Sequence, residues 1–294
     1  GAPLGGLFSP VDDEDATATL EAAWQGGVRS FDTAPLYGHG LSEHRVGTFL
    51  ATKPRDLFVL STKVGRLLSG DAALFDFSRD GVRASLEASL ERLGLDRVDV
   101  ALIHDPDDHF DEAMYQSYPA LEELRTEGVV RAIGLGMNQA EMLERFVRDT
   151  DIDCVLVAGR YSLLDDRAAA GLFAAAIERG VSVLVGGVFN GGILTDSRLP
   201  ATFDYQPAPA ALVARAENIR AIAARHNVLL GHVAMQFVLR NPAVTSVVVG
   251  ARSPAEITDD LSMFSSAIPN ALWTELESSG LLGWRDPDPD EKFA

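Results

Sequence analysis

The sequence lacks the features that mark secreted, membrane-bound and nucleic-acid-binding proteins. It has a single cysteine, Cys154, so no disulfide can form within the chain. Acidic residues outnumber basic ones by 43 to 25, and the resulting net charge of −18 repels phosphate backbones and anionic lipid headgroups. No apolar run reaches the roughly 18 residues of a membrane span, and the opening GAPLGGLFSP has no basic segment followed by an apolar one. We therefore expect a cytoplasmic protein that binds neither nucleic acid nor membranes.

The remaining composition is that of an ordinary folded protein. Hydrophobic residues make up 47% of the 294 residues and charged residues 23%, which is enough for a full core. Barrels of alternating strands and helices reach this length as one domain, so we expect a single domain over residues 1–294. Cys154 lies in DIDCVLVAG, which is typical of a buried strand, and we interpret it as a structural thiol.

Short runs rich in Val, Ile and Leu alternate with longer segments of helical period. Seven such runs predict strands, at 28–31, 57–61, 98–103, 130–135, 153–157, 181–185 and 245–249. Helices are predicted at about 12–26, 42–51, 79–94, 112–128, 139–149 and 166–179, as a pair across 210–240, and at 254–266. This alternation predicts an α/β fold, a single (β/α)8 TIM barrel.

Both ends of the chain and one connection depart from this repeat. The opening GAPLGG is interpreted as the end of a first strand whose beginning lies outside the sequence, which would bring the strands to eight. The loop 186–209, after the seventh strand of that count, holds four glycines and three prolines, and loops of this length are usually functional; a disordered insertion is the alternative. An extra C-terminal helix is expected, followed by an extended acidic tail at 284–294.

Polar residues gather at the carboxyl ends of three successive predicted strands. VRSFDTAPLYG contains Asp32 and Tyr37, LFVLSTKVG contains Lys63, and VDVALIHDP contains His104. Each residue alone is weak evidence, because a strand-end Asp often forms a turn and a Lys is usually solvated. Since the carboxyl ends of the strands in a parallel barrel face one cavity, their joint occurrence indicates one site.

These segments resemble the successive signatures of the aldo-keto reductase superfamily. The likeness rests on FDTAPLYG with the following Ser42-Glu43, on STKVG and on LIHDP, and it spans nearly the whole chain. GRYSLLDD and GGVFNGGIL resemble a narrower branch that holds aldose 1-dehydrogenases, fucose dehydrogenase and pyridoxal 4-dehydrogenase. The resemblance implies an NAD(P)-dependent oxidoreductase that acts on a small polar substrate such as an aldose or a pyridoxal-like aldehyde. It implies a catalytic tetrad of Asp32, Tyr37, Lys63 and His104.

Elementary chemistry supports these four roles. A carbonyl that accepts hydride becomes an alkoxide, so a proton donor must lie within hydrogen-bond reach of its oxygen. A free tyrosine has a pKa of about 10, and a neighbouring ammonium lowers it by favouring phenolate, which is the role predicted for Lys63 beside Tyr37. Asp32 would hold Lys63 charged and oriented, and His104 would donate a hydrogen bond to the substrate oxygen.

The segments that resemble the nicotinamide site depart from the family's pattern. No GxGxxG follows an early strand, which argues against a Rossmann domain. Gly136 and Met137 stand where many relatives have a Ser-Asn pair for the carboxamide, and Asn138 is a candidate replacement. Gly186 stands where a Tyr often stacks on the nicotinamide, and Phe189 is either its replacement or a loop anchor. The cofactor-binding candidates here are therefore Met137, Asn138, Phe189 and Asn190.

The segment VVVGARSPAEITDD resembles the family's segment for adenosine and its 2′ substituent, and it contributes Gly250, Arg252, Glu256 and Asp260 as candidates. Arg252 would pair with the 2′-phosphate of NADP. Glu256 would repel that phosphate and accept a hydrogen bond from the ribose hydroxyl of NAD, and Asp260 adds negative charge. The balance favours NAD over NADP.

Two other functions compete with this interpretation. A metal-dependent barrel hydrolase would use the carboxylates and imidazoles near two of the strand ends, although Lys63 would compete for the same carboxylates. The possible ligands are Asp32, His104, Asp105, Asp107, Asp108 and His109. A regulatory module that binds nicotinamide without turnover is the second alternative, and an intact tetrad argues against it. The oligomeric state stays open, because neither heptads nor a large apolar stripe occur.

Overall fold

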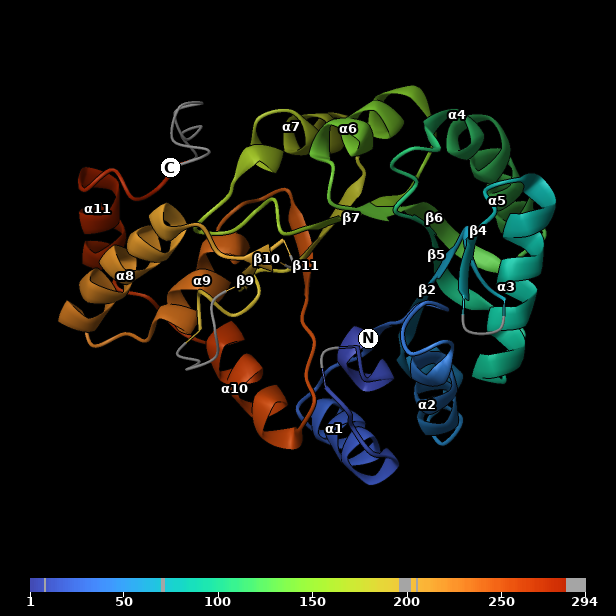
Figure 1. The fold of residues 1–294 in the computed structure, drawn as a ribbon, viewed down its shortest axis with the longest axis horizontal. Coiled ribbons are helices and arrows are strands. Elements are labelled where there is room, and N and C mark those ends of the chain that lie inside the picture. The colour runs from blue at the N-terminus through green and yellow to red at the C-terminus, as the bar shows by residue number, and fades with distance from the viewer. Residues whose placement is uncertain (8, 70–71, 196–201, 205, 284–294) are drawn as a thin grey trace.

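The computed structural model describes residues 1–7, 9–69, 72–195, 202–204 and 206–283 (Figure 1). Its main sheet has seven strands in the order β1-β2-β5-β6-β7-β8-β11, and all neighbouring pairs are parallel. The strands are β1 (Ser30–Asp32), β2 (Val59–Val64), β5 (Val98–His104), β6 (Val130–Met137), β7 (Cys154–Ala158), β8 (Ser182–Gly186) and β11 (Val244–Val248). The seven predicted strands are confirmed, and the fold is a parallel α/β barrel of the TIM type.

Helices connect the strands and lie outside the curved sheet (Figure 1). They are α1 (Asp13–Gln25), α2 (Leu41–Leu50), α3 (Arg79–Leu93), α4 (Phe110–Glu112), α5 (Tyr118–Thr126), α6 (Ala140–Asp149), α7 (Leu172–Arg179), α8 (Ala210–Arg225), α9 (Leu230–Leu239), α10 (Pro254–Phe264) and α11 (Asn270–Ser278). The last of these is the extra C-terminal helix expected from the sequence. Among the described helices, none is long and apolar enough to cross a membrane.

The core lies between the sheet and the helices. Parallel strands are covered on both faces, which explains their almost continuous runs of Val, Ile and Leu. Leu60 and Ile133 are fully buried there, and a second apolar cluster around Val233 and Leu272 joins α8, α9 and α11. Cys154 is buried as predicted, and burial with the nearby Asp153 raises the pKa of its thiol to about 12.

The N-terminal segment is not a strand, contrary to the prediction. Ala2–Gly5 form a short 3-10 helix, η1, because Pro3 lacks an N–H and has a φ suited to a first helical turn. The carbonyl of Gly1 accepts a hydrogen bond of 3.0 Å from Ser42 Oγ on α2. β1 and β11 are therefore the two edges of the sheet, and among the described residues the ring is completed by packing of α1 against α10.

The helix predicted over 112–128 is divided. α4 continues into a π-helical segment at Ala113–Ser117, and α5 follows. Pro119 lies in the first turn of α5 and has no N–H for the carbonyl four residues earlier, so the regular helical ladder is interrupted there.

Two short antiparallel ribbons, which the sequence patterns do not predict, follow β2 and β8. β3 (Arg66–Ser69) pairs with β4 (Ala72–Phe75), which sets Arg66 opposite Phe75. β9 (Thr202–Phe203) pairs with β10 (Gln206–Pro207) within the predicted long loop. Asp204 ties that loop to Arg160 through two hydrogen bonds of 2.8 and 2.9 Å. The rest of the loop at 196–201 and 205, and the predicted tail at 284–294, lie outside the described residues.

Candidate active site

The four predicted tetrad residues come from the carboxyl ends of three adjacent strands. Asp32 ends β1, Lys63 is the penultimate residue of β2, and His104 ends β5. Tyr37 lies in the turn that follows β1. Since β1, β2 and β5 are neighbours in the sheet, the topology brings all four residues to one mouth of the barrel.

Lys63 is the centre of this group. Its ammonium donates hydrogen bonds to Asp32 Oδ1 at 2.7 Å and to the carbonyl of Thr33 at 2.8 Å. Ser61 Oγ donates to the other Asp32 oxygen at 2.5 Å. Only 2% of the Lys63 side chain is exposed. Burial alone would lower the pKa of Lys63, but Asp32 and Tyr37 hold it above its ordinary value, so the ammonium stays charged.

Tyr37 is fixed by a close contact between two backbone segments. A Cβ on Gly5 would lie 2.5 Å from the carbonyl carbon of Tyr37, and a Cβ on Gly38 would lie 2.2 Å from the carbonyl oxygen of Gly5. Only glycine fits at such an approach. The glycines of GAPLGG and of PLYG therefore let η1 pack directly against the turn that carries Tyr37.

The electrostatics of Tyr37 differ from the sequence prediction. Lys63 Nζ lies 4.7 Å from the centre of the phenol ring, and its charge lowers the pKa as predicted. Burial outweighs this effect, however, so the pKa of Tyr37 is raised above its ordinary value. The phenol therefore holds its proton at neutral pH, as a proton donor must.

His104 lies edge-on to Tyr37, with ring centres 5.9 Å apart and an angle of 88° between the planes. It is 6% exposed. Burial, together with the charges of Lys63 and Arg66, holds the pKa of His104 well below its ordinary value, so the imidazole is neutral. Its Nδ1 atom is buried and has no hydrogen-bond partner within the described part of the chain.

Glu43, part of the family signature, lies on α2 and forms hydrogen bonds with β2 and α3. It is completely buried and accepts hydrogen bonds of 2.6 Å from Thr62 Oγ1 and from Arg92 Nε. These contacts join α2, β2 and α3. Because Thr62 precedes Lys63, we interpret Glu43 as a positioning residue for the strand that carries the ammonium.

A cavity of about 440 Å³ opens beside His104. It is lined by Arg66, Phe75, Asp105, Asp107, Asp108, His109, Asn138 and Gln139. Arg66 and Phe75 are missing from the sequence prediction, because the hairpin that carries them was not recognised. The sequence signal that would have indicated it is the run of Ser69, Gly70 and Asp71, residue types that are common in turns, between two short apolar segments.

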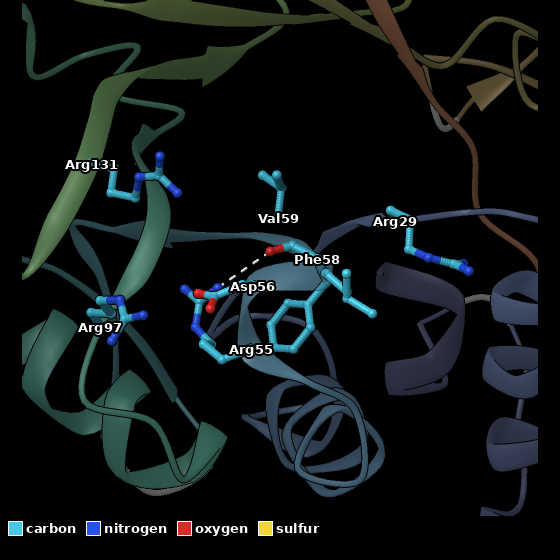
Figure 2. Close-up of a pocket in the computed structure, with 8 residues that line it drawn as sticks. Arg29, Arg55, Asp56, Phe58, Val59, Arg97 and Arg131 are labelled. Carbon is cyan, nitrogen blue, oxygen red and sulfur yellow. Dashed lines mark hydrogen bonds between the residues drawn. The ribbon is translucent and has the colours of Figure 1, made fainter.

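A second cavity, of about 240 Å³, lies at the opposite mouth of the barrel. Figure 2 shows the arginines that line it, among them Arg55 before β2, Arg97 before β5 and Arg131 near the start of β6. The buried Asp99 pairs with Arg55 at 2.9 Å and with Arg131 at 3.4 Å. Because this cavity lies at the amino ends of the strands, we assign it no part in catalysis.

The predicted nicotinamide-binding residues follow the carboxyl ends of β6 and β8. Asn138 lines the larger cavity, whereas the side chain of Met137 is buried in the core, so any cofactor contact from Met137 would come from its main chain. Phe189 is partly buried against both apolar clusters, as expected for a loop anchor. Asn190 is 6% exposed, and its side-chain oxygen has no hydrogen-bond partner among the described residues.

The predicted adenosine-binding residues lie between β11 and the first turns of α10, where Arg252 and Glu256 pair with each other rather than acting separately. Glu256 Oε1 accepts from Arg252 Nη2 at 2.6 Å, and Glu256 Oε2 accepts from the Arg252 backbone at 2.7 Å. Gly250 precedes this pair. Asp260 lies one turn beyond Glu256, and burial together with the charges of Glu256 and Asp259 raises the pKa of Asp260 to about 7.

Comparison with known proteins identifies the fold and the chemistry together. The model of the aldo/keto reductase family matches residues 1–280. The chain belongs to this family. D-threo-aldose 1-dehydrogenase of a Pseudomonas species is 42% identical over 304 residues, covering 96% of this chain and 92% of that protein. Pyridoxal 4-dehydrogenase of Microbacterium luteolum is 38% identical over 317 residues, with the same two coverages, 96% and 92%.

Solved structures of the aldo-keto reductase type share the fold. One from Bacillus halodurans, in its holo form, has a TM-score of 0.80 and 24% identity, covering 98% of this chain and 93% of that chain. A glycerol dehydrogenase from Gluconobacter oxydans has a TM-score of 0.78 and 24% identity, covering 94% and 88%. At these identities the two structures bear on the fold alone.

This aldo-keto reductase is an NAD(P)-dependent oxidoreductase, as the sequence predicts. The family match opposes the competing interpretation as a barrel hydrolase. The described residues contain no group of three or more His, Cys, Asp or Glu side chains that could hold a metal ion. The interpretation as a regulatory module without turnover is opposed by the likeness to named dehydrogenases over nearly the whole chain.

Proposed function

We propose that this aldo-keto reductase oxidises the anomeric hemiacetal of an aldose to a lactone, reduces small aldehydes to alcohols in a separate reaction at the same site, and prefers NAD. The observation that carries the proposal is the buried Lys63–Asp32 pair beside the Tyr37 phenol. A buried charge pair is costly to assemble, and its position next to a phenol suits control of a proton transfer. The names of the two dehydrogenases above, which specify an aldose and pyridoxal, support a small polar carbonyl compound as substrate.

In the direction of reduction, Tyr37 gives its proton to the substrate oxygen. Lys63 stabilises the phenolate that remains, because its ammonium is held near the ring by Asp32 and cannot turn towards water. His104 is neutral, so it donates a hydrogen bond to the same oxygen without surrendering a proton. In the direction of oxidation, the Tyr37 phenolate accepts the hydroxyl proton of the substrate. A bound nicotinamide supplies or accepts the hydride.

The residues at this mouth fit a nicotinamide cofactor. A Cβ on Gly136 would make only ordinary van der Waals contacts, at 3.5 Å or more, and one of them is with Lys63 Cε at 3.8 Å, so position 136 lies directly beside the end of the lysine. The buried side-chain oxygen of Asn190, which has no partner among the described residues, is an acceptor for the amide of the carboxamide. Asn138, at the wall of the cavity, is a second polar contact.

The preference for NAD rests on the pairing of Arg252. Glu256 engages the Arg252 guanidinium and the Arg252 backbone, and a 2′-phosphate would have to displace this carboxylate to reach the arginine. Asp260, on the same face of α10, adds repulsion whenever it is ionised. A ribose hydroxyl carries no charge, so Asp260 does not repel it, and it does not have to displace Glu256 from Arg252.

The catalytic proposal is tested with the parent protein and the Tyr37→Phe variant. Aldoses, pyridoxal and short aldehydes are screened with both nicotinamides by following the absorbance of the reduced cofactor. We expect Tyr37→Phe to keep its affinity for cofactor but to lose about 10²–10⁴-fold in turnover, the usual contribution of general acid–base catalysis. Tyr115→Phe, at a side chain that is 73% exposed, is the matched control. Equal turnover of Tyr37→Phe and the parent would remove Tyr37 from the mechanism.

Cofactor preference is tested by measuring dissociation constants for NADH and NADPH through fluorescence quenching. We expect the parent to bind NADH more tightly. Glu256→Gln should free Arg252 and improve NADPH binding by about 1–3 kcal/mol, the range for a charge-assisted hydrogen bond. A parent that prefers NADPH tenfold or more would show that Arg252 leaves Glu256 for the phosphate, and the proposal would be wrong.

A further inference from the structure

Two residues of opposite charge, Arg66 and Asp105, lie beside the tetrad and have no part in the proton transfer. Asp105 follows His104 directly, and its Oδ2 atom lies 3.6 Å from His104 Nε2. Arg66 begins the β3–β4 hairpin, and its Nη2 atom lies 3.3 Å from the same Asp105 oxygen. The pair is therefore one residue away from the imidazole that would hydrogen-bond to the substrate oxygen.

The arginine is held rigidly but is incompletely paired. Its guanidinium lies 5.0 Å from the ring centre of Phe75, across the hairpin, and 21% of the side chain is exposed. A matched arginine–carboxylate pair forms two short parallel hydrogen bonds, whereas the distance between Arg66 Nη2 and Asp105 Oδ2 is 3.3 Å. Arg66 Nε is also buried without a hydrogen-bond partner in the described chain. The Arg66 and Asp105 side chains are 21% and 28% exposed, so both can reach a third molecule in the cavity.

The backbone at Asp105 is strained. Its φ of 43° is left-handed, a conformation that is uncommon outside glycine and in which Asp and Asn are enriched. Its N–H nevertheless donates to the Gly136 carbonyl at 3.0 Å, so the chain stays in register with β6 while the side chain is redirected. Such strain concentrates at residues whose orientation serves a ligand.

The rest of the cavity fits a neutral molecule with one apolar face. Phe75 is 46% exposed and stacks on His109 at 5.9 Å with an interplanar angle of 15°. Asp107 and Asp108 line the same cavity, so its carboxylates outnumber its single guanidinium three to one. An anionic substrate would be repelled, whereas a polyol offers hydroxyl groups to the charged pair and C–H groups to the aromatic ring.

We propose that Arg66 and Asp105 recognise neighbouring hydroxyl groups of a polyhydroxylated substrate, Asp105 by accepting from one and Arg66 by donating to the next. Phe75 contacts the C–H face of the same molecule. This inference rests on the proposed function and deepens it. It assigns to Arg66 and Asp105 the selectivity for hydroxylated aldehydes over aldehydes without hydroxyl groups. Both residues determine specificity, and the chemical step belongs to the tetrad.

The test compares two aldehydes of equal carbon number, glyceraldehyde and propanal, both reduced with the same cofactor. Asp105→Asn keeps the shape and the left-handed backbone preference but removes the charge, and Arg66→Met keeps an unbranched apolar stem. We expect each variant to lose about 10- to 100-fold in kcat/KM for glyceraldehyde, mainly through KM, because a hydrogen bond to a charged group contributes about that factor. Propanal should change less than threefold. Asp96→Asn, at a carboxylate that is 83% exposed and lies before β5 away from this cavity, is the matched control.

Each outcome of this experiment either supports or overturns the proposed role of Arg66 and Asp105. Equal losses with both aldehydes would show that the pair acts through His104 or the fold, and no loss with either would show that it does not touch the substrate; both results overturn the inference. If the parent reduces propanal but does not favour glyceraldehyde over it, the oxidoreductase proposal stands and the hydroxyl subsite fails. If the parent reduces neither compound and oxidises no aldose, both proposals fall together.

Discussion

Replacing Lys63 with methionine tests the central interaction of the site. Methionine has a similar length but no charge, so the variant leaves the Asp32 carboxylate, 12% exposed, without its cation and the Thr33 carbonyl without a donor. Removing one partner of a buried ion pair costs about 3–5 kcal/mol. Ser61 still donates to Asp32, so we expect a loss near the lower end, about 3 kcal/mol, in the free energy of unfolding by urea. Lys53→Met, at a lysine paired with the half-exposed Glu21, should cost less than about 1 kcal/mol.

The same variant has a distinct kinetic signature. The Lys63 charge lowers the pKa of Tyr37, in opposition to burial, so its removal should raise that pKa further. Oxidation requires the phenolate, and its rate rises with pH until Tyr37 is deprotonated. The alkaline limb of the oxidation profile should therefore move to higher pH in Lys63→Met. The double variant Asp32→Asn, Lys63→Met should recover stability but not turnover. A Lys63→Met protein with parental stability and an unshifted alkaline limb would refute this account.

Two further substitutions test the supports of the tetrad. Glu43→Gln should lower the free energy of unfolding by about 3 kcal/mol, because it removes the fully buried carboxylate that pairs with the partly exposed Arg92. Glu87→Gln, on the exposed face of α3, should leave urea denaturation unchanged. Gly5→Ala would bring a methyl group to 2.5 Å from the Tyr37 carbonyl carbon, so turnover should fall while cofactor fluorescence quenching is retained. Parental turnover in Gly5→Ala would show that the Tyr37 turn does not depend on this packing.

The strands, and the gathering of the four tetrad candidates at one mouth of the barrel, were predictable because their signals are local. Buried parallel strands appear in the sequence as apolar runs, and the polar residues of a barrel's active site follow these runs at the carboxyl ends of the strands. The N-terminal segment was predicted incorrectly, because GAPLGG resembles a strand end only if the backbone can extend. In the structure Pro3 and the close approach of Gly5 to the Tyr37 turn form a 3-10 helix instead. That contact joins segments more than thirty residues apart, and no local pattern reports it.

The electrostatic properties of the site were the hardest to predict from the sequence. The sequence places Lys63 near Tyr37 and correctly indicates the direction in which Lys63 acts, but burial decides the net pKa of the phenol. Arg252 and Glu256 were expected to favour different cofactors. Their spacing of four residues across the start of α10 instead lets them pair with each other. The sequence does not indicate that Arg66 belongs to the site, because Arg66 meets its partner Asp105 only when the β3–β4 hairpin has formed.

The protonation state of His104 determines which residue is the acid. A neutral imidazole carries one N–H, and a carboxylate favours that hydrogen on the nitrogen facing it. Asp105 faces Nε2 at 3.6 Å, whereas Nδ1 is buried without a partner in the described chain, so we infer that Nε2 is the donor. Since the pKa of His104 lies well below its ordinary value, the reductive kcat/KM should show no inflection near the usual histidine pKa of about 6.5. His104→Gln, whose amide can donate, should keep more turnover than His104→Ala. An inflection in that range that disappears in His104→Gln would show that His104 titrates during catalysis, and Tyr37 would no longer be the sole proton donor.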